Sequence, residues 1–73
     1  MKTIDLHGIK HKDVERVVSD AVCDNEVPLR IITGNSALMK NLVIETLKYF
    51  NLTANETIGN SGILVVYKLR SKQ

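Results

Sequence analysis

The sequence predicts an α/β fold, a two-layer sandwich in which a four-stranded mixed sheet carries two helices on one face, in the order βαβαββ. Alternating apolar and polar residues near the N-terminus are typical of a half-buried strand. Two stretches with apolar residues every three or four positions are typical of amphipathic helices. A near-continuous apolar run over 63–69 indicates a central strand. The 73 residues are expected to form one domain over 2–70, followed by a frayed tail, 71–73.

A strand over 2–7 and a helix over 11–24 are expected first. The helix is predicted from a stripe at i, i+3, i+4, i+7 and i+8, formed by Val14, Val17, Val18, Ala21 and Val22. It lacks a good N-cap, because Lys10 and His11 stand where Ser or Asp is preferred. Pro28 prevents the helix from continuing.

The second half is predicted to contain three strands and one helix, and the last two strands form a hairpin. A short β-branched strand over 29–33 leads through Gly34 into a helix over 36–51. A weak polar strand over 53–58 and the strong strand over 63–69 flank a turn cluster, so they form a hairpin. The expected inner residues of the second helix are Leu38, Leu42, Val43, Leu47 and Phe50.

The connection between the first two strands fixes their geometry. A right-handed crossover makes them parallel neighbours, so both end at the edge of the sheet where α/β proteins bind ligands. Two helices cover one face only, and the alternation then leaves polar residues on the other, open face. The residues expected on the open face are Thr3, Asp5, His7, Arg30 and Lys68, whereas the alternation with Lys68 argues against Tyr67 there.

Asp5 and His7 are the candidate catalytic residues, because a carboxylate and an imidazole two positions apart on a strand point the same way. The imidazole can move a proton while the carboxylate orients a water molecule, which is the chemistry of phosphodiester hydrolysis. The alternative is structural: Asp5 accepts hydrogen bonds from turn N–H groups, and His7 only ends the strand. A dedicated metal site is not expected, since one carboxylate is too few. A divalent cation such as Mg²⁺ stays open as a cofactor.

Candidate phosphate contacts follow both strand ends. The turn at 33–36 offers backbone N–H groups at the start of a helix, and a short basic segment at 10–12 follows the first motif. The alternatives are an ordinary strand-to-helix connection and a solvated surface. The full set of candidate nucleic-acid contacts is Gly8, Lys10, His11, Lys12, Arg30, Thr33, Gly34, Asn35 and Ser36.

Two motifs resemble those of the Smr (small MutS-related) domain. They are Ile-Asp-Leu-His-Gly at 4–8 and Leu-Arg-Ile-Ile-Thr-Gly at 29–34, and the likeness extends over 2–70. The resemblance implies a fold related to the C-terminal domain of translation initiation factor 3. It also implies a nicking endonuclease acting on RNA or DNA. The second motif of that family is usually Thr-Gly-x-Gly, whereas this chain has Ser36 at the last position, where it can cap the following helix.

Composition restricts the location and the partners. The net charge of +2 is small for a nucleic-acid-binding protein, so phosphate contacts depend on local placement of basic residues. A single cysteine, no signal peptide and no membrane-length apolar run predict a cytoplasmic protein without a membrane partner. Two further functions stay open. One is a nucleic-acid-binding module without catalysis. The other is a protein-interaction or homo-oligomer domain whose open face carries Ile32, Leu64 or Val66.

Overall fold

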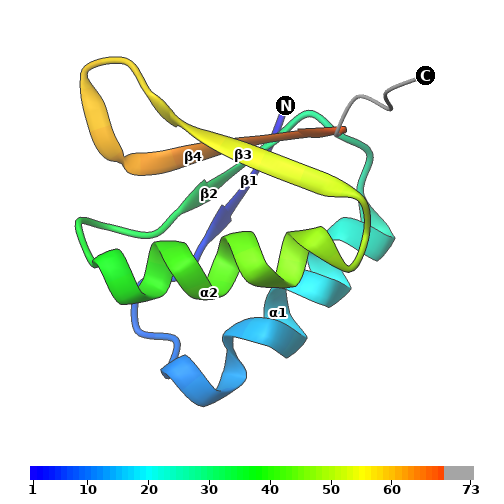
Figure 1. The fold of residues 1–73 in the computed structure, drawn as a ribbon, viewed down its shortest axis with the longest axis horizontal. Coiled ribbons are helices and arrows are strands. Elements are labelled where there is room, and N and C mark those ends of the chain that lie inside the picture. The colour runs from blue at the N-terminus through cyan, green and yellow to red at the C-terminus, as the bar shows by residue number, and fades with distance from the viewer. Residues whose placement is uncertain (69–73) are drawn as a thin grey trace.

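A computed structural model describes residues 1–68 and confirms the predicted fold class (Figure 1). The chain forms a four-stranded mixed sheet and two helices in the order βαβαββ. The elements are β1 (Lys2–Asp5), α1 (His11–Asp24), β2 (Leu29–Ile32), α2 (Ala37–Lys48), β3 (Leu52–Thr57) and β4 (Asn60–Lys68). The predicted end of the last strand at Leu69 and the predicted tail, 71–73, lie outside the described residues.

The sheet has the strand order β1-β2-β4-β3. β1 and β2 are parallel neighbours, as the crossover predicted, and β4 pairs antiparallel with both β2 and β3. β4 is therefore central, in agreement with its apolar sequence. In the register, Asp5 lies opposite Ile32, which in turn lies opposite Ile63. The motifs at the ends of β1 and β2 consequently meet at one edge of the sheet.

Both helices cover the same face of the sheet (Figure 1). Along each strand every second side chain points toward the helices. These side chains form the core together with the apolar residues of α1 and α2 that face the sheet. The fully buried side chains are Leu6, Val14, Val18, Leu29, Ile31, Val43, Leu47, Leu64 and Val66. Leu64 and Val66 thus belong to the core, so of the three apolar residues that would favour an interaction surface only Ile32 lies on the open face.

The starts of both helices match the sequence expectations, whereas α2 ends at Lys48 and not at Asn51 as predicted. Lys10 at the start of α1 provides no side-chain cap, whereas the Ser36 hydroxyl oxygen accepts the Met39 N–H at 3.1 Å and caps α2. At the other end of α1, the Asn25 side-chain amide donates to the Ala21 carbonyl oxygen at 2.9 Å. Ser36 therefore has a structural role that the usual glycine of the resembling motif could not supply.

The inner face of α2 differs from the prediction. Leu38 and Phe50 are 53% and 38% exposed, and Met39 and Thr46 are buried instead. Thr46 is a polar residue, but its hydroxyl donates to the Leu42 carbonyl oxygen at 2.8 Å, so its burial leaves no hydrogen bond unmade. Because a buried threonine interrupts the apolar pattern, counting apolar residues alone does not show which side of α2 faces the sheet.

Candidate functional site

Asp5 is the last residue of β1, and His7 lies in the turn that follows, so the prediction that both belong to one strand over 2–7 was wrong. Both residues are exposed. The Asp5 Oδ1 atom accepts the backbone N–H of His7 at 2.8 Å. This is the contact that the structural alternative expected, and it fixes the orientation of the carboxylate. Within residues 1–68 the Oδ2 atom of Asp5 has no hydrogen-bond partner, so one carboxylate oxygen is open to solvent or to a ligand.

Gly8 shapes the turn that carries His7 away from the sheet. The Ile9 N–H donates to the Leu6 carbonyl oxygen at 3.0 Å, which closes a four-residue turn. Gly8 is the third residue of this turn and has a φ of +81°, as a type II turn requires. The glycine of the first motif therefore has a conformational role, and Leu6 anchors the turn to the core.

The turn at 33–36 is less open than predicted. The Gly62 carbonyl oxygen accepts the backbone N–H groups of Thr33 and Gly34 at 2.8 and 3.1 Å. Thr33 is buried and its hydroxyl donates to the Gly34 carbonyl oxygen at 2.9 Å, so neither group of Thr33 is available to a ligand. The expectation of free N–H groups was wrong for these two residues. Within residues 1–68 only the Asn35 and Ser36 N–H groups of this turn lack a partner.

The β3–β4 hairpin holds the other side of this turn. The Ser61 hydroxyl donates to the Asn35 side-chain oxygen at 2.9 Å, which leaves the Asn35 amide nitrogen exposed. A phosphate approaching the turn would therefore meet the Asn35 amide and the Asn35 and Ser36 backbone N–H groups.

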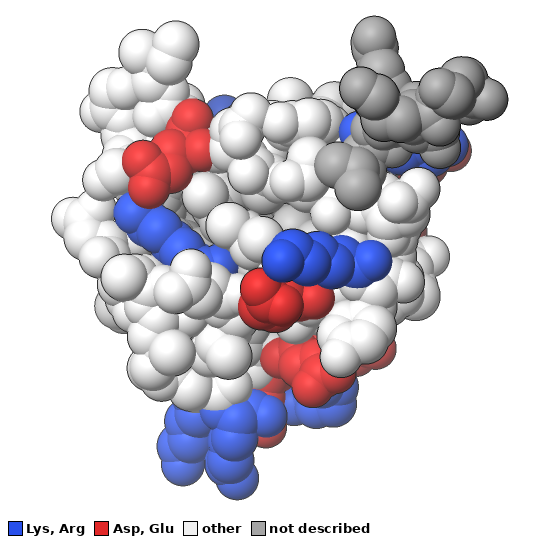
Figure 2. All heavy atoms as spheres, viewed as in Figure 1, with Lys and Arg blue, Asp and Glu red and all other residues white. Residues whose placement is uncertain are grey.

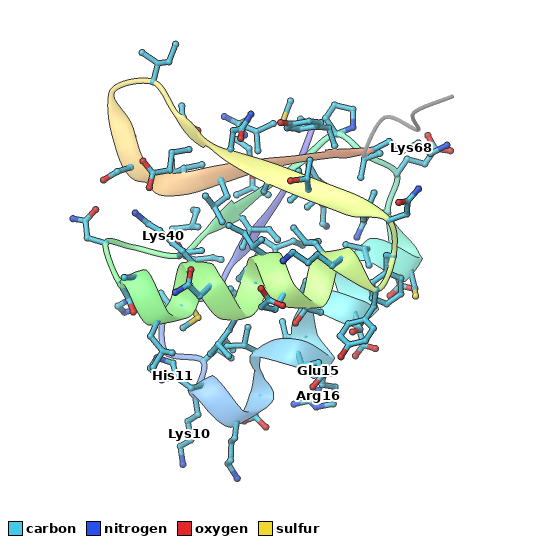
Figure 3. All side chains as sticks on the ribbon, viewed as in Figure 1. Lys10, His11, Glu15, Arg16, Lys40 and Lys68 are labelled. Atoms are coloured by element: carbon cyan, nitrogen blue, oxygen red, sulfur yellow. The ribbon has the colours of Figure 1, made fainter. Side chains whose placement is uncertain are left out.

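The basic segment at 10–12 does not surround the first motif. Figure 2 shows Lys and Arg side chains gathered at the end of the molecule where α1 begins, and Lys10 points away from the sheet (Figure 3). His11 and Lys12 line a hollow between the helices together with Glu15 and Glu45. The start of α1 thus places these two side chains at the helix layer, and Lys12 forms no ion pair within residues 1–68.

The open face of the sheet carries apolar residues in its centre and polar residues toward its edges. Arg30 is exposed while Leu29 and Ile31 are buried, as predicted, and Arg30 forms no ion pair within residues 1–68. The outward-facing residues are Thr3 and Asp5 of β1, Arg30 and Ile32 of β2, Ile63, Val65 and Tyr67 of β4, and Thr53 and Asn55 of β3.

Tyr67 and Lys68 lie on the opposite faces from those predicted. Because Leu64 and Val66 are buried under the helices, the alternation along β4 places Tyr67 on the open face and Lys68 on the helix side. The residues from 63 to 66 are all apolar, so the sequence contains no alternation that reveals which of them face the helices.

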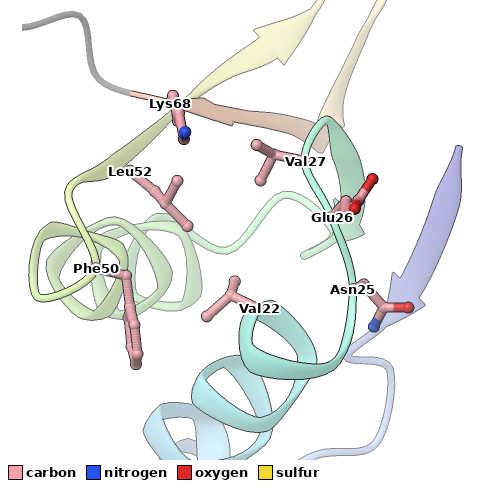
Figure 4. Close-up of a pocket in the computed structure, with 7 residues that line it drawn as sticks. All are labelled: Val22, Asn25, Glu26, Val27, Phe50, Leu52 and Lys68. Carbon is pink, nitrogen blue, oxygen red and sulfur yellow. The ribbon is translucent and has the colours of Figure 1, made fainter.

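Lys68 lines a hollow of about 430 Å³ (Figure 4). The other lining residues include Glu26, Val27 and Leu52. In the sheet register Leu52 and Lys68 lie at the opposite end from Asp5. The hollow is therefore separate from every predicted catalytic or nucleic-acid-binding residue.

Within residues 1–68 no group of three His, Cys, Asp or Glu side chains could hold a metal ion. In the same part of the chain no helix is long and apolar enough to cross a membrane. Comparisons with protein-family models, with curated proteins and with solved structures found no match. The resemblance to the Smr domain therefore stays a prediction that depends on the two motifs.

Proposed function

We propose that this protein binds nucleic acid and hydrolyses phosphodiester bonds as an endonuclease, with Asp5 and His7 as its reacting groups. The observation that carries the proposal is the exposed Asp5 carboxylate beside His7, where β1 and β2 end together. The hydrogen bond from the His7 N–H holds one carboxylate oxygen and leaves the other available. The two motifs that resemble the Smr domain support the same activity.

The proposed reaction is attack of water on the phosphorus atom. The imidazole of His7 takes one proton from the water, while the free Asp5 oxygen accepts a hydrogen bond from the other O–H of the same water. The water oxygen bonds to phosphorus as the bond from phosphorus to the leaving oxygen breaks. The leaving oxygen then takes a proton from the imidazolium, which returns His7 to its starting state.

The residues present do not fit a metal ion held by the protein. Hard cations such as Mg²⁺ prefer several oxygen ligands, and among residues 1–68 no group of three His, Cys, Asp or Glu side chains could hold a metal ion. No step of the proposed reaction is therefore assigned to a metal, and the assay compares Mg²⁺ with EDTA.

Four groups near this edge would bind the phosphates. The Asn35 amide and the Asn35 and Ser36 N–H groups lie in the turn after β2, and Arg30 lies on the open face next to Asp5 in the diagonal register. A guanidinium matches the geometry of a phosphate. RNA and DNA are both candidate substrates, and the assay compares them.

A cleavage assay tests the proposal with labelled single-stranded RNA and supercoiled plasmid. Asp5→Asn keeps an acceptor for the His7 N–H but removes the negative charge, and His7→Ala removes the imidazole. We expect both variants to lose at least about 100-fold in cleavage rate, the usual contribution of a general acid–base. His11→Ala is the comparison variant, because it removes the other histidine of the chain, which lines the hollow between the helices, and it should lower the rate far less than His7→Ala.

A folded wild-type protein that cuts neither substrate, or a His7→Ala variant as active as the wild type, would contradict the proposed hydrolysis. The His7–Asp5 contact also favours a second candidate function, because a hydrogen bond that shapes the turn does not require a catalytic role for Asp5. That candidate is a nucleic-acid-binding module without catalysis. It predicts oligonucleotide binding that both Asp5→Asn and His7→Ala retain.

A further inference from the structure

Asp5, Arg30 and Tyr67 form a diagonal line across the open face. Arg30 lies one strand over from Asp5 and two residues back along β2, since Thr3 is its direct partner. Tyr67 lies one further strand over and two further residues along β4, since Val65 is the partner of Arg30. Diagonal neighbours in a sheet are about 7–8 Å apart, so the line from Asp5 to Tyr67 is about 15 Å long.

The Tyr67 ring is held along the surface of the sheet. Its hydroxyl oxygen accepts a hydrogen bond from the Asn55 side-chain amide. Asn55 is the partner of Val65, two residues from the partner of Tyr67 itself, so the ring must lean along the face to reach it. Tyr67 is nevertheless 36% exposed, which leaves part of its ring accessible from solvent. A tethered aromatic ring loses little rotamer freedom when a ligand stacks on it.

We propose that the open face is the track of a single-stranded nucleic acid, with a base stacked on Tyr67 and a phosphate on Arg30. This inference rests on the proposed function, because Asp5 at the end of the diagonal is where the strand would reach the reacting groups. Along the duplex each strand advances about 3.4 Å per nucleotide, so 15 Å corresponds to about four stacked nucleotides, and fewer in an extended strand. Stacking requires an unpaired base, so the ligand is a single strand rather than a duplex.

The size of the open face disfavours a folded protein partner. Four strands about 4.8 Å apart and three rows of outward residues about 6.7 Å apart cover about 400 Å². A stable protein–protein interface buries about 800 Å² on each partner, twice this area. A single strand needs a narrower surface, and Arg30 offers it a positive charge that has no acidic partner in an ion pair among residues 1–68.

A tryptophan placed at Tyr67 reports directly on stacking. The chain contains no tryptophan, so Tyr67→Trp gives a single fluorophore on the open face. Tyr49→Trp is the matched control, because Tyr49 is 81% exposed at the end of α2 in the helix layer. Ten-nucleotide oligo(dT) and oligo(U) are the probes, and they distinguish DNA from RNA. Anisotropy of the fluorescein-labelled oligonucleotide measures binding in parallel. All of these proteins also carry His7→Ala, which is expected to prevent cleavage of the probe, and a gel checks that the probe is intact.

We expect the oligonucleotide to quench Tyr67→Trp fluorescence and to leave Tyr49→Trp unchanged. Tyr67→Ala should raise the Kd roughly 5- to 150-fold, the range for loss of one stacked base. Tyr67→Phe should stay within a few-fold of the wild type, because it keeps the ring. Arg30→Gln should reduce the slope of log K against log salt by about 0.7, the value for one phosphate contact with a single strand. Arg30→Lys should keep the slope.

Two results would overturn the track and leave the proposed function intact. One is oligonucleotide binding without quenching of Tyr67→Trp, and the other is binding that Tyr67→Ala and Arg30→Gln leave unchanged. No anisotropy change with the wild-type protein would overturn the proposed function and the track together. A mass that rises with concentration, and that Val65→Arg returns to the monomer value, would assign this face to a second copy and overturn the track.

Discussion

Gly62 packs its backbone directly against Gly34. The Gly34 N–H donates to the Gly62 carbonyl oxygen at 3.1 Å, and a Cβ added at Gly62 would lie 3.2 Å from the Gly34 Cα atom. Such a distance is tighter than ordinary van der Waals contact, and its partner is main chain that has little room to move. The start of β4 is thereby fixed to the turn that precedes α2, next to the proposed site.

Gly62→Ala should destabilise the protein by about 1–3 kcal/mol, because the added methyl group forces the two backbones apart. Urea unfolding followed by circular dichroism measures this change. Ser61→Ala is the neighbouring control: it removes the hydroxyl that bonds to Asn35 but adds no volume, so it should cost less than about 1 kcal/mol. Equal stability of Gly62→Ala and the wild type would show that the close approach tolerates a methyl group.

Ser36→Ala should lower the free energy of unfolding by about 1 kcal/mol. The variant removes the hydroxyl that accepts the Met39 N–H and leaves the first turn of α2 without its cap. Ser36→Gly should cost only a few tenths of a kcal/mol, because glycine is itself tolerated at an N-cap. Thermal or urea unfolding ranks the three proteins, and a Ser36→Gly variant less stable than Ser36→Ala would contradict the capping role.

Leu64 and Val65 are adjacent residues on opposite faces of β4, and they test the assignment of the faces. Leu64→Ala should cost about 2–5 kcal/mol, because it leaves a cavity in the core. A protein of this size has about 4–11 kcal/mol of stability, so the variant should be only marginally folded. Val65→Ala on the open face should cost less than about 1 kcal/mol. Urea midpoints compare the two variants. A larger loss for Val65→Ala than for Leu64→Ala would contradict the assignment of Leu64 to the core and Val65 to the open face.

Replacing Lys10 and Lys12 by Glu should weaken oligonucleotide binding less than the single change Arg30→Glu. Lys10 points away from the sheet and Lys12 lines the hollow between the helices, so both act on a bound strand from a distance through solvent that salt screens. Anisotropy titrations at low and high salt measure the difference. A larger loss for the lysine pair would move the binding surface to the start of α1.

The order of elements was predictable because each depends on local sequence. The period-2 pattern around Ile4 predicted β1 and the outward Thr3 and Asp5, although the strand ends before Leu6 and His7, and the stripe from Val14 to Val22 predicted α1. The apolar run of β4 predicted that this strand is central. A strand between two other strands and under the helices is more buried than an edge strand, and its sequence is correspondingly more apolar.

The phase of α2 and the faces of β4 depended on tertiary contacts. Thr46 replaces an apolar residue in the buried stripe because its hydroxyl bonds within the helix, and Leu38 is exposed although it is apolar. Tyr67 and Lys68 lie on the faces opposite to those predicted. Residues 63–66 are uniformly apolar, so only the contacts with the helices decide which alternate residues of β4 are buried.

By itself the sequence determined which residues carry the chemistry of the proposed site: the Asp5–His7 pair, the turn after β2 and the exposed Arg30. Only the tertiary structure decided what surrounds them. The hairpin brings the Gly62 carbonyl oxygen to the N–H groups of Thr33 and Gly34, although 28 residues separate Gly34 from Gly62 along the chain. It also brings Tyr67 into line with Asp5 and Arg30. Strand pairing joins residues that are distant along the chain, and no local pattern records which of them will meet.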